Sequence, residues 1–297
     1  MSYQIEESFV QQYSSNVQLL SQQKGSKLRS IVPIEYIKGE YAYVDQIGQT
    51  AAKPITTRHA DTPIMNVEHA RRRLSLTAFN WNGLIDSIDK IKMLNDPTSP
   101  YAISAAFAMG RAMDAEIYDA ALGTAYTGKN GNNPIVLPNN QKLAADDKGF
   151  TFAKLKKLKR MFDSNDIEEH NRYILYTAAQ LDDLLGEEKV TSADYNAVRA
   201  LERGEINEYM GFKFIQLNGI RDTGKKIITA DTVSGKTVRH CVAFATNCMK
   251  LGIGEDVKTE ITPRADKNYA MQVYFEMAIG AARLEEEGVV QFDCVES

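Results

Sequence analysis

The sequence predicts a mixed α+β protein, and three observations support this class. Helical periodicity is clear in two segments, 99–123 and 151–163, and alternating patterns typical of strands occur at 40–44, 73–79 and 269–277. No internal repeat is visible along the 297 residues, a length that suits about two domains. The order of helical and alternating segments therefore indicates packed helices and sheets rather than a repeat array.

The first part of the chain carries too few apolar residues for a core of its own. Residues 1–30 are polar and glutamine-rich. Strand-like runs at 40–44 and 73–79 flank a stretch, 49–69, with few large apolar residues. We expect a long two-stranded arm with a flexible tip that needs a partner surface, because an isolated hairpin is marginal in water.

The clearest helix is predicted over 99–123. Ser99 is a good N-cap, Pro100 suits the first helical position, and Gly123 is a plausible stop. The alanine-rich interior spans about 24 residues, which gives a length of roughly 36 Å. This is long for a helix in a globular domain.

The remaining segments alternate between short helices and strands. Residues 151–163 place Phe152, Leu155, Leu158 and Phe162 on one helical face. A buried strand is expected at 173–176. It is followed by a helix opened by a Thr177–Gln180 capping box. A further short helix is expected at 192–201. Strands are expected at 211–217, 225–229, 238–246, 269–277 and 289–295, and a turn at 285–288 precedes the last of them.

Composition and charge exclude several classes of protein. The 39 acidic and 35 basic residues give a net charge of −4, which argues against a generally basic nucleic-acid binder. The three cysteines lack a C-x-x-C spacing and indicate reduced thiols. The first residues contain no apolar signal segment, and no run approaches the ~20 apolar residues of a membrane span. We therefore expect folding in a cytoplasm, without membrane contact.

A phosphate-binding loop is the nearest match to a catalytic motif. Residues 123–130, Gly-Thr-Ala-Tyr-Thr-Gly-Lys-Asn, differ from G-x-x-x-x-G-K-[ST] at the final position. Asn130 lacks the hydroxyl that would bind magnesium, and the loop follows a helix instead of a strand. A nucleotide-binding enzyme using Gly123–Lys129 remains an alternative, and a turn after a helix is the simpler interpretation.

Two histidine groups are also weak candidates for chemistry. His59, Asp61 and His69 do not have the spacing of a zinc site. His240 and Cys241 are strand neighbours, which point to opposite faces of a sheet, so they are not expected to form a nucleophile pair. We expect no catalytic residue, no cofactor and no metal.

Basic residues cluster at two places. The first is Arg71–Arg73. The second, Lys154, Lys156, Lys157, Lys159 and Arg160, lies on the polar side of the helix at 151–163. A solvated face is the default interpretation, and contact with nucleic acid or with acidic groups of another subunit is the alternative. No aromatic residues interleave with the second cluster, which argues against base stacking.

Taken in order, pieces along nearly the whole chain resemble the major capsid proteins of tailed bacteriophages, which have the HK97-like fold. The pieces are Phe9–Tyr13, Asn16–Leu20, Gly39–Glu40, Asp45–Gly48, Arg58–Pro63, His69–Arg72, Asp86 with Asp89, Asp96–Pro97, Gly110–Asp114, Ala278–Arg283 and Glu287–Val290. The match rests on the order of the pieces, because none of them is diagnostic alone.

The resemblance implies a layout in four parts. Residues 1–39 form an N-terminal arm and 40–82 an extended β-hairpin loop that lies over a neighbouring subunit. Residues 83–165 and 258–297 form a peripheral domain with a long spine helix, and 166–257 form an axial domain. The candidates for contact between subunits are Tyr41, Tyr43, Arg58, His59, Asp61, Arg71, Arg72 and Arg73. The basic cluster at 154–160 is the candidate surface facing DNA.

The implied function is structural. Copies are expected to assemble into the pentamers and hexamers of an icosahedral shell that encloses double-stranded DNA, in a virion built in the bacterial cytoplasm. The implied partners are further copies, a portal protein, a separate scaffolding protein and a decoration protein. An encapsulin-like compartment, which shares the fold and holds protein cargo, is an alternative. Because the arm-like sequence starts close to Met1, we expect no proteolytic removal of a leader. Lys53 is the sole candidate for a covalent cross-link.

Overall fold

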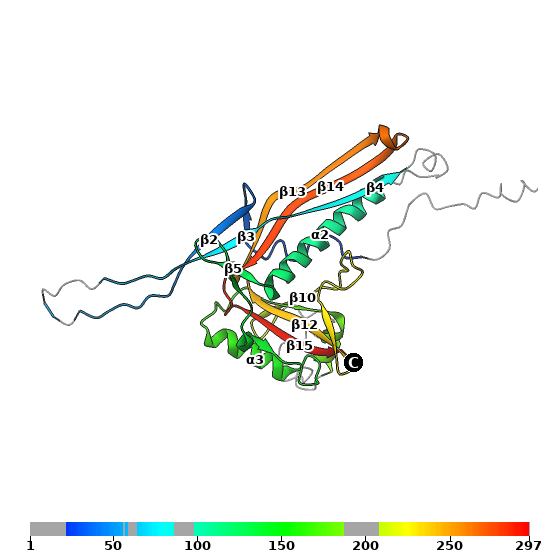
Figure 1. Ribbon diagram of the computed structural model, residues 1–297. Coiled ribbons are helices and arrows are strands. Elements are labelled where there is room, and N and C mark those ends of the chain that lie inside the picture. The colour runs from blue at the N-terminus through cyan, green and yellow to red at the C-terminus, as the bar shows by residue number, and fades with distance from the viewer. Residues whose placement is uncertain (1–21, 56, 59–63, 86–97, 187–207, 297) are drawn as a thin grey trace, which may run out of the picture.

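The computed structural model describes residues 22–55, 57–58, 64–85, 98–186 and 208–296. It shows an elongated α+β subunit, with a long sheet and helix at one end, a compact sheet with shorter helices at the other, and an arm projecting to the side (Figure 1). The fold class predicted from sequence is confirmed.

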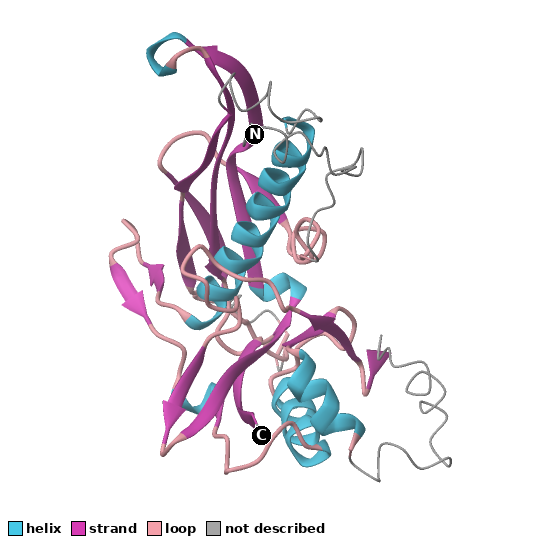
Figure 2. Ribbon diagram, turned by 90° about the vertical axis from the view of Figure 1, so that its right-hand side faces the viewer, coloured by secondary structure: helices cyan, strands magenta, loops and turns pink. Residues whose placement is uncertain are grey.

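The long sheet has four strands in the order β1-β13-β14-β4. Its strands are β1 (Ile34–Tyr36), β13 (Met249–Arg264), β14 (Ala270–Arg283) and β4 (Thr77–Ile85). β13 and β14 pair antiparallel along most of their length, with bulges between Ile253 and Lys258. The helix α2 (Thr98–Leu122) crosses one face of this sheet, as Figure 2 shows, and buries Met109, Met113 and Ile117.

The helix α2 confirms the longest sequence prediction. Its 25 residues begin one position before the expected start. At its end the Gly123 amide donates to the Asp119 carbonyl at 2.7 Å. The alanine-rich sequence favours helix, and the apolar side chains that recur along one face explain why it lies on the sheet.

The compact sheet has seven strands in the order β7-β15-β12-β8-β10-β9, with β11 paired to β12. The strands are β7 (Lys142–Leu143), β8 (Arg172–Tyr176), β9 (Glu208–Tyr209), β10 (Phe212–Gln216), β11 (Ala230–Val233), β12 (Lys236–Ala245) and β15 (Val289–Glu296). The helices are α3 (Phe152–Ser164) and α4 (Ala178–Leu185), with 3₁₀ turns at Asn139–Gln141, Thr246–Cys248 and Ala265–Lys267 elsewhere.

Two local signals in this half are confirmed, and one predicted strand is not. The Thr177 amide donates to Gln180 Oε1 at 3.0 Å, which confirms the capping box of α4. The apolar face of α3 packs on the sheet through an edge-on contact between Phe162 and Phe212, with ring centroids 5.4 Å apart. The strand predicted at 225–229 is wrong: the backbone turns there, and β11 follows it. The helix predicted at 192–201 lies outside the described residues.

The third sheet forms the base of the arm. Its order is β2-β3-β5-β6, and its strands are β2 (Tyr41–Ile47), β3 (His69–Ser75), β5 (Ala125–Thr127) and β6 (Asn133–Ile135). The run at 73–79, predicted as a single strand, is divided between two sheets. β3 ends at Ser75 and β4 begins at Thr77 in the long sheet. Gly280 permits this crossing, because a Cβ there would lie 1.8 Å from the Ser75 carbonyl oxygen.

The division of the chain between the two main sheets differs from the predicted boundaries. Both α3 and β15, assigned from sequence to the unit of the long helix, belong to the compact sheet. β13 joins the long sheet from Met249, and it is continuous across the expected boundary at 257/258. Strand pairing decides sheet membership, and pairing between segments far apart in sequence leaves no local signal.

Candidate assembly interface

The arm is a two-stranded extension with little protein around it. β2 and β3 pair from Tyr41–Ser75 to Ile47–His69, and the Gly48 amide continues the ladder to the Glu68 carbonyl. Beyond that point the seven described residues 49–55, at about 3.3 Å per residue, give a reach of about 23 Å. Figure 1 shows this segment leaving the body on the side opposite the free end of α2.

Apolar side chains on the outer arm are exposed to an unusual degree. Ile55 is 92% exposed and Ile64 is 88% exposed, with Ile47 at 72%. Arg58 is exposed as well, whereas His59 and Asp61, two expected contact residues, lie outside the described residues. Large apolar groups held this far from any core indicate a surface that is covered in an assembly.

A tyrosine–arginine face covers the base of the arm. Tyr41 and Tyr43 from β2, Arg71 and Arg73 from β3, and Tyr126 from β5 share this side of the sheet. The Arg73 guanidinium lies 5.1 Å from the Tyr41 ring centroid and 4.5 Å from that of Tyr126, and Arg71 lies 5.4 Å from that of Tyr43. The three tyrosines are each about 40% exposed, so this face is available to a partner.

Arg72 points to the opposite side, and its assignment as a contact between subunits is not supported. Its Nη2 lies 2.6 Å from Glu286 Oε2, and its side chain is 8% exposed. Arg283, fully buried, lies 3.5 Å from the other oxygen of Glu286. Gln46 Nε2 donates to the Leu284 carbonyl at 3.0 Å. Alternation along β3 sends Arg72 inward between Arg71 and Arg73, where it attaches the arm to the body of its own subunit.

The loop after α2 does not form a phosphate site. It leads into β5 and then through Gly128, which has φ +95°, to β6, so the strand–loop–helix order of a phosphate-binding loop is absent from this described segment. Lys129 instead lines a shallow hollow with His69 and Arg71. A hydrogen bond from Arg71 lowers the pKa of Asp45 in the same hollow. The structure therefore gives no support to the nucleotide-binding alternative.

The basic helix α3 contains one residue that cannot face DNA. Lys154 is 4% exposed. Its Nζ donates to three backbone carbonyls, at 2.8 Å to Ala145, 2.9 Å to Lys148 and 2.8 Å to Asp293. Burial lowers the pKa of this ammonium group. The prediction of a solvated Lys154 is wrong, because the long side chain turns back beneath the helix end to three carbonyls that converge there, two of which also accept a backbone amide.

The rest of the cluster remains on the surface. Lys156, Lys157 and Arg160 are exposed, and Lys159 is half-buried with its Nζ 3.5 Å from Asp163 Oδ2. These four groups form a continuous basic edge along the outer side of α3. An exposed basic edge without aromatic residues suits non-specific contact with phosphate groups.

The remaining histidine and cysteine candidates show no catalytic geometry. His240 is half-buried, with Nδ1 2.7 Å from Asp293 Oδ1 and Nε2 3.1 Å from Asp231 Oδ2. The hydrogen bond to Asp293 raises the His240 pKa, against the effect of burial. Cys241 is fully buried, and burial raises its pKa. Within the described ranges no group of three His, Cys, Asp or Glu residues could hold a metal, and no helix there is long and apolar enough to cross a membrane.

A buried carboxylate on α2 holds the start of the described chain, and the sequence patterns had assigned it no role. Asp114 is fully buried and accepts hydrogen bonds from Ser26 Oγ at 2.6 Å, from the Lys27 amide at 3.0 Å and from the Leu28 amide at 3.0 Å. Gln23 Nε2 also donates to it. Burial raises the Asp114 pKa, and these donors oppose the shift.

The same turn of α2 lets the two backbones touch. A Cβ on Gly110 would lie 2.4 Å from the Gly25 carbonyl carbon, so only glycine fits there. Arg111 Nη1 donates to Gln22 Oε1 at 2.9 Å. The available sequence signal was the pair Gly110 and Asp114, one turn apart in an alanine-rich helix. Together these residues attach the start of the described chain, residues 22–28, to α2.

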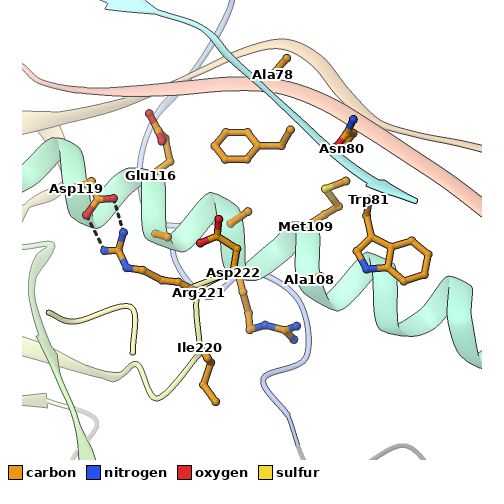
Figure 3. Close-up of a pocket in the computed structure, with 14 residues that line it drawn as sticks. Ala78, Asn80, Trp81, Ala108, Met109, Glu116, Asp119, Ile220, Arg221 and Asp222 are labelled. Carbon is orange, nitrogen blue, oxygen red and sulfur yellow. Dashed lines mark hydrogen bonds and ion pairs between the residues drawn. The ribbon is translucent and has the colours of Figure 1, made fainter. Parts of the chain in front are cut away.

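A groove runs between β4 and α2 and is closed at one end by residues 220–222. It has a volume of about 560 Å³. Its floor contains Ala108, Ala112 and Ala115, and Figure 3 shows Trp81 at one end and the Asp119–Arg221 ion pair at the other. Small side chains on α2 create this hollow, and no pattern in the sequence indicates it.

These features together define a class of protein. The subunit has a projecting hairpin arm, a long helix on an elongated sheet and a compact second sheet, which is the architecture of the HK97-like capsid fold. Its arm exposes large apolar side chains that have no core in their own subunit.

Comparison with known proteins agrees with this class. Residues 5–296 match the family model for phage capsid protein, and the chain belongs to that family. No curated protein is significantly similar to it in sequence.

Solved phage capsids share the fold at low sequence identity. The capsid of Ralstonia phage GP4 superposes with a TM-score of 0.74 at 10% sequence identity. The alignment covers 98% of this chain and 96% of the GP4 chain. The capsid of cyanophage P-SCSP1u gives a TM-score of 0.72 at 15% identity, with 98% and 94% covered. The acid-stable capsid of Helicobacter pylori bacteriophage KHP30 gives a TM-score of 0.72 at 10% identity, and the alignment covers 100% of this chain and 99% of the KHP30 chain.

Proposed function

We propose that this chain is the major capsid subunit of a tailed bacteriophage, which self-assembles into pentamers and hexamers of an icosahedral shell around double-stranded DNA. The observation that carries the proposal is the arm, whose exposed isoleucines have no core in their own subunit. Family membership supports the structural role and placement in the virion. No catalytic role is proposed for any residue.

Each part of the fold has a role in this proposal. The long sheet with α2 is the peripheral unit, and the compact sheet with α3 and α4 is the axial unit that gathers around the symmetry axes. The arm and its tyrosine–arginine face lie over a neighbouring copy. Many modest interfaces then close together, so that the stability of each copy depends on its neighbours.

The basic edge of α3 is assigned to the inner surface of the shell. Lys156, Lys157, Lys159 and Arg160 contact packaged DNA without sequence preference. Reversal of charge at Lys156 and Lys157 is expected to lower the DNA content of particles. Unchanged DNA content in such particles would count against the assignment.

The further partners follow from the kind of assembly proposed. A separate scaffolding protein guides the shell, a portal protein occupies one vertex, and a decoration protein is an optional addition. Assembly takes place in the bacterial cytoplasm.

Expression of the full chain with negative-stain microscopy tests the proposal. Regular closed particles, or capsomers that close when scaffolding protein is supplied, are the expected result. A chain that stays monomeric at high concentration in both conditions would refute the proposal. Particles that hold a protein cargo and no DNA in infected cells would instead favour an encapsulin-like compartment.

Deletion of residues 49–66 tests the role of the arm. The shortened subunit is expected to fold, because this segment has little core to lose, and to assemble poorly. A deletion that unfolds the free subunit would show that the arm has been assigned wrongly.

A further inference from the structure

The last turns of α2 join the two main units of the subunit. Figure 1 shows this end of the helix where the long sheet meets the compact sheet. On the side of the long sheet, the fully buried Arg283 of β14 donates to the Ala121 and Gly123 carbonyls, each at 2.8 Å. The end of α2 is therefore attached to the long sheet, and a contact that it makes with the compact sheet connects the two units.

Tyr118 makes this connection to the compact sheet. The residue is 1% exposed, and its hydroxyl donates to the His240 carbonyl of β12 at 2.8 Å. The same oxygen accepts the Thr229 amide at 3.1 Å and lies 3.0 Å from Thr229 Oγ1. Thr229 is itself attached to β12, because its carbonyl accepts the His240 amide at 3.0 Å. One hydroxyl group thus holds α2 both to β12 and to the segment beside it.

Arg221 attaches the next position of α2 to the same part of the compact unit. Its two terminal nitrogens lie 2.5 and 2.6 Å from the two oxygens of Asp119, the ion pair drawn in Figure 3. The guanidinium group also donates to the Ile227 carbonyl at 2.7 Å and lies 5.7 Å from the centre of the Tyr118 ring. Arg221 belongs to the loop that leads from β10 to β11, so its side chain crosses from the compact unit to α2.

These polar contacts restrict the angle between the two units more tightly than the apolar contacts around them. The apolar core runs from one unit to the other as a single cluster, with Ile117, Ile228 and Val242 among its members. Apolar burial has no preferred direction, so it gives less resistance when one layer slides over another. Hydrogen bonds weaken steeply when they are bent. A change in the angle between the units would therefore strain the bonds of Tyr118 and Arg221 first.

We propose that the junction of Tyr118, Asp119 and Arg221 fixes the angle between the two units of each copy and thereby the size of the closed shell. The inference rests on the proposed function, because shell size has meaning only for a subunit that assembles. It adds the residues that determine the curvature. Identical copies repeat the same angle, so a small change in one subunit is added again at each neighbour around the shell.

Spin labels on the free subunit measure the angle directly. The three native cysteines are buried, so Ala106→Cys on α2 and Arg160→Cys on α3 introduce an exposed pair for labelling, one in each unit. Pulsed electron-spin measurements are expected to give one narrow distribution of distances for the parent. Tyr118→Phe and Arg221→Met, tested separately, are each expected to widen this distribution at least about twofold, because directional bonds across the junction are lost.

The matched control removes a tyrosine hydroxyl that does not connect the units. Tyr274 donates to Glu276 Oε2 at 3.1 Å within β14, so Tyr274→Phe is expected to keep the parent distribution. Fluorescence of Trp81 shows whether each variant is folded. If Tyr118→Phe does not fold, Arg221→Met decides alone, because its ion pair is partly exposed and adds little to stability. Folded variants at the junction that keep the parent distribution would overturn the proposal.

Particle diameters test the consequence for assembly. Parent and Tyr274→Phe particles, assembled under the same conditions and imaged by cryo-electron microscopy, are expected to fall in one size class. Tyr118→Phe and Arg221→Met are expected to give mixed diameters and unclosed shells, with the share of the parent size class lowered at least about twofold. Shells of uniform parent size from variants with widened distributions would overturn the link between the junction and shell size. A parent chain that forms no particles under any condition instead refutes the proposed function itself.

Discussion

Replacement of Asp114 by alanine is expected to release the N-terminal segment from α2. The carboxylate is fully buried and receives two amides and a hydroxyl at 2.6–3.0 Å, together with the Gln23 side chain. Alanine leaves these donors without an acceptor at a buried position. The segment from Gln23 to Leu28 then keeps the apolar contacts of Leu28 and two hydrogen bonds, from Lys27 Nζ to the Gln216 carbonyl and from Arg111 to the Gln23 carbonyl.

The magnitude follows from the number of donors. A buried donor left without a partner costs about 1–3 kcal/mol. Three strong donors therefore give a loss of about 3 kcal/mol in the free energy of unfolding, reduced slightly because a buried charge is also removed. Detachment of the segment limits the loss, because the freed donors can then reach water.

Two assays on the free subunit distinguish these responses. Urea unfolding, followed by the fluorescence of the single tryptophan, Trp81, measures the loss of stability. Brief trypsin treatment measures detachment, because Lys24, Lys27 and Arg29 become cleavable once the segment leaves α2. Asp119→Ala on the same helix is the control. Its carboxylate is half-exposed in an ion pair, and its loss is expected to cost about 1 kcal/mol or less. An Asp114→Ala subunit with a loss below about 1 kcal/mol and no new cleavage would refute the role of Asp114.

Three further predictions concern groups in the body of the subunit. Lys154→Ala is expected to cost about 2 kcal/mol, measured by urea unfolding, because three hydrogen bonds from a buried ammonium group are lost while the Ala145 and Lys148 carbonyls keep a backbone amide, and an effect no larger than that of Lys156→Ala would contradict this. Glu286→Gln leaves two buried guanidinium groups without a counter-charge and should cost about 3–5 kcal/mol, and a variant with unchanged stability would refute the anchoring role of this residue. The pKa of His240 is raised in the fold, mainly by its hydrogen bond to Asp293. The contribution of the protonated His240 side chain to the stability of the fold is therefore complete below about pH 6.5, and it is lost as pH rises through the folded pKa. The stability difference from His240→Asn should be larger at pH 6 than at pH 9, and a difference independent of pH would count against the imidazolium.

Local signals in the sequence were sufficient for several elements. The long helix, the capping box at Thr177 and the apolar face of α3 depend on residues within a few positions of one another, so they are readable from the chain alone. The arm was also predicted from sequence, because a shortage of large apolar residues between two strands is a local property. The resemblance to the capsid family likewise depends only on the order of short pieces along the chain.

The positions of buried polar groups were not readable in this way. Lys154 is one of five basic residues in a seven-residue stretch of α3, and periodicity places it on the polar side. Its ammonium group is buried only because β15 and the loop before α3 bring three carbonyl oxygens to one point. Arg72 likewise has the same side chain as Arg71 and Arg73, and only strand alternation and the location of Glu286 separate their roles.

The class of fold, the principal helices, the unsupported arm and the lack of a recognisable catalytic motif all follow from the amino-acid sequence, since each depends on local composition or spacing. Three other features required the folded chain: which strands share a sheet, how Asp114 and Glu286 hold the N-terminal segment and the arm, and where α2 leaves a groove. These features arise from contacts between residues 80 to more than 200 positions apart, as in the pairing of Asp114 with Ser26 and of Glu286 with Arg72. Such contacts are fixed by packing and hydrogen-bond satisfaction over the whole subunit, which no short window of sequence contains.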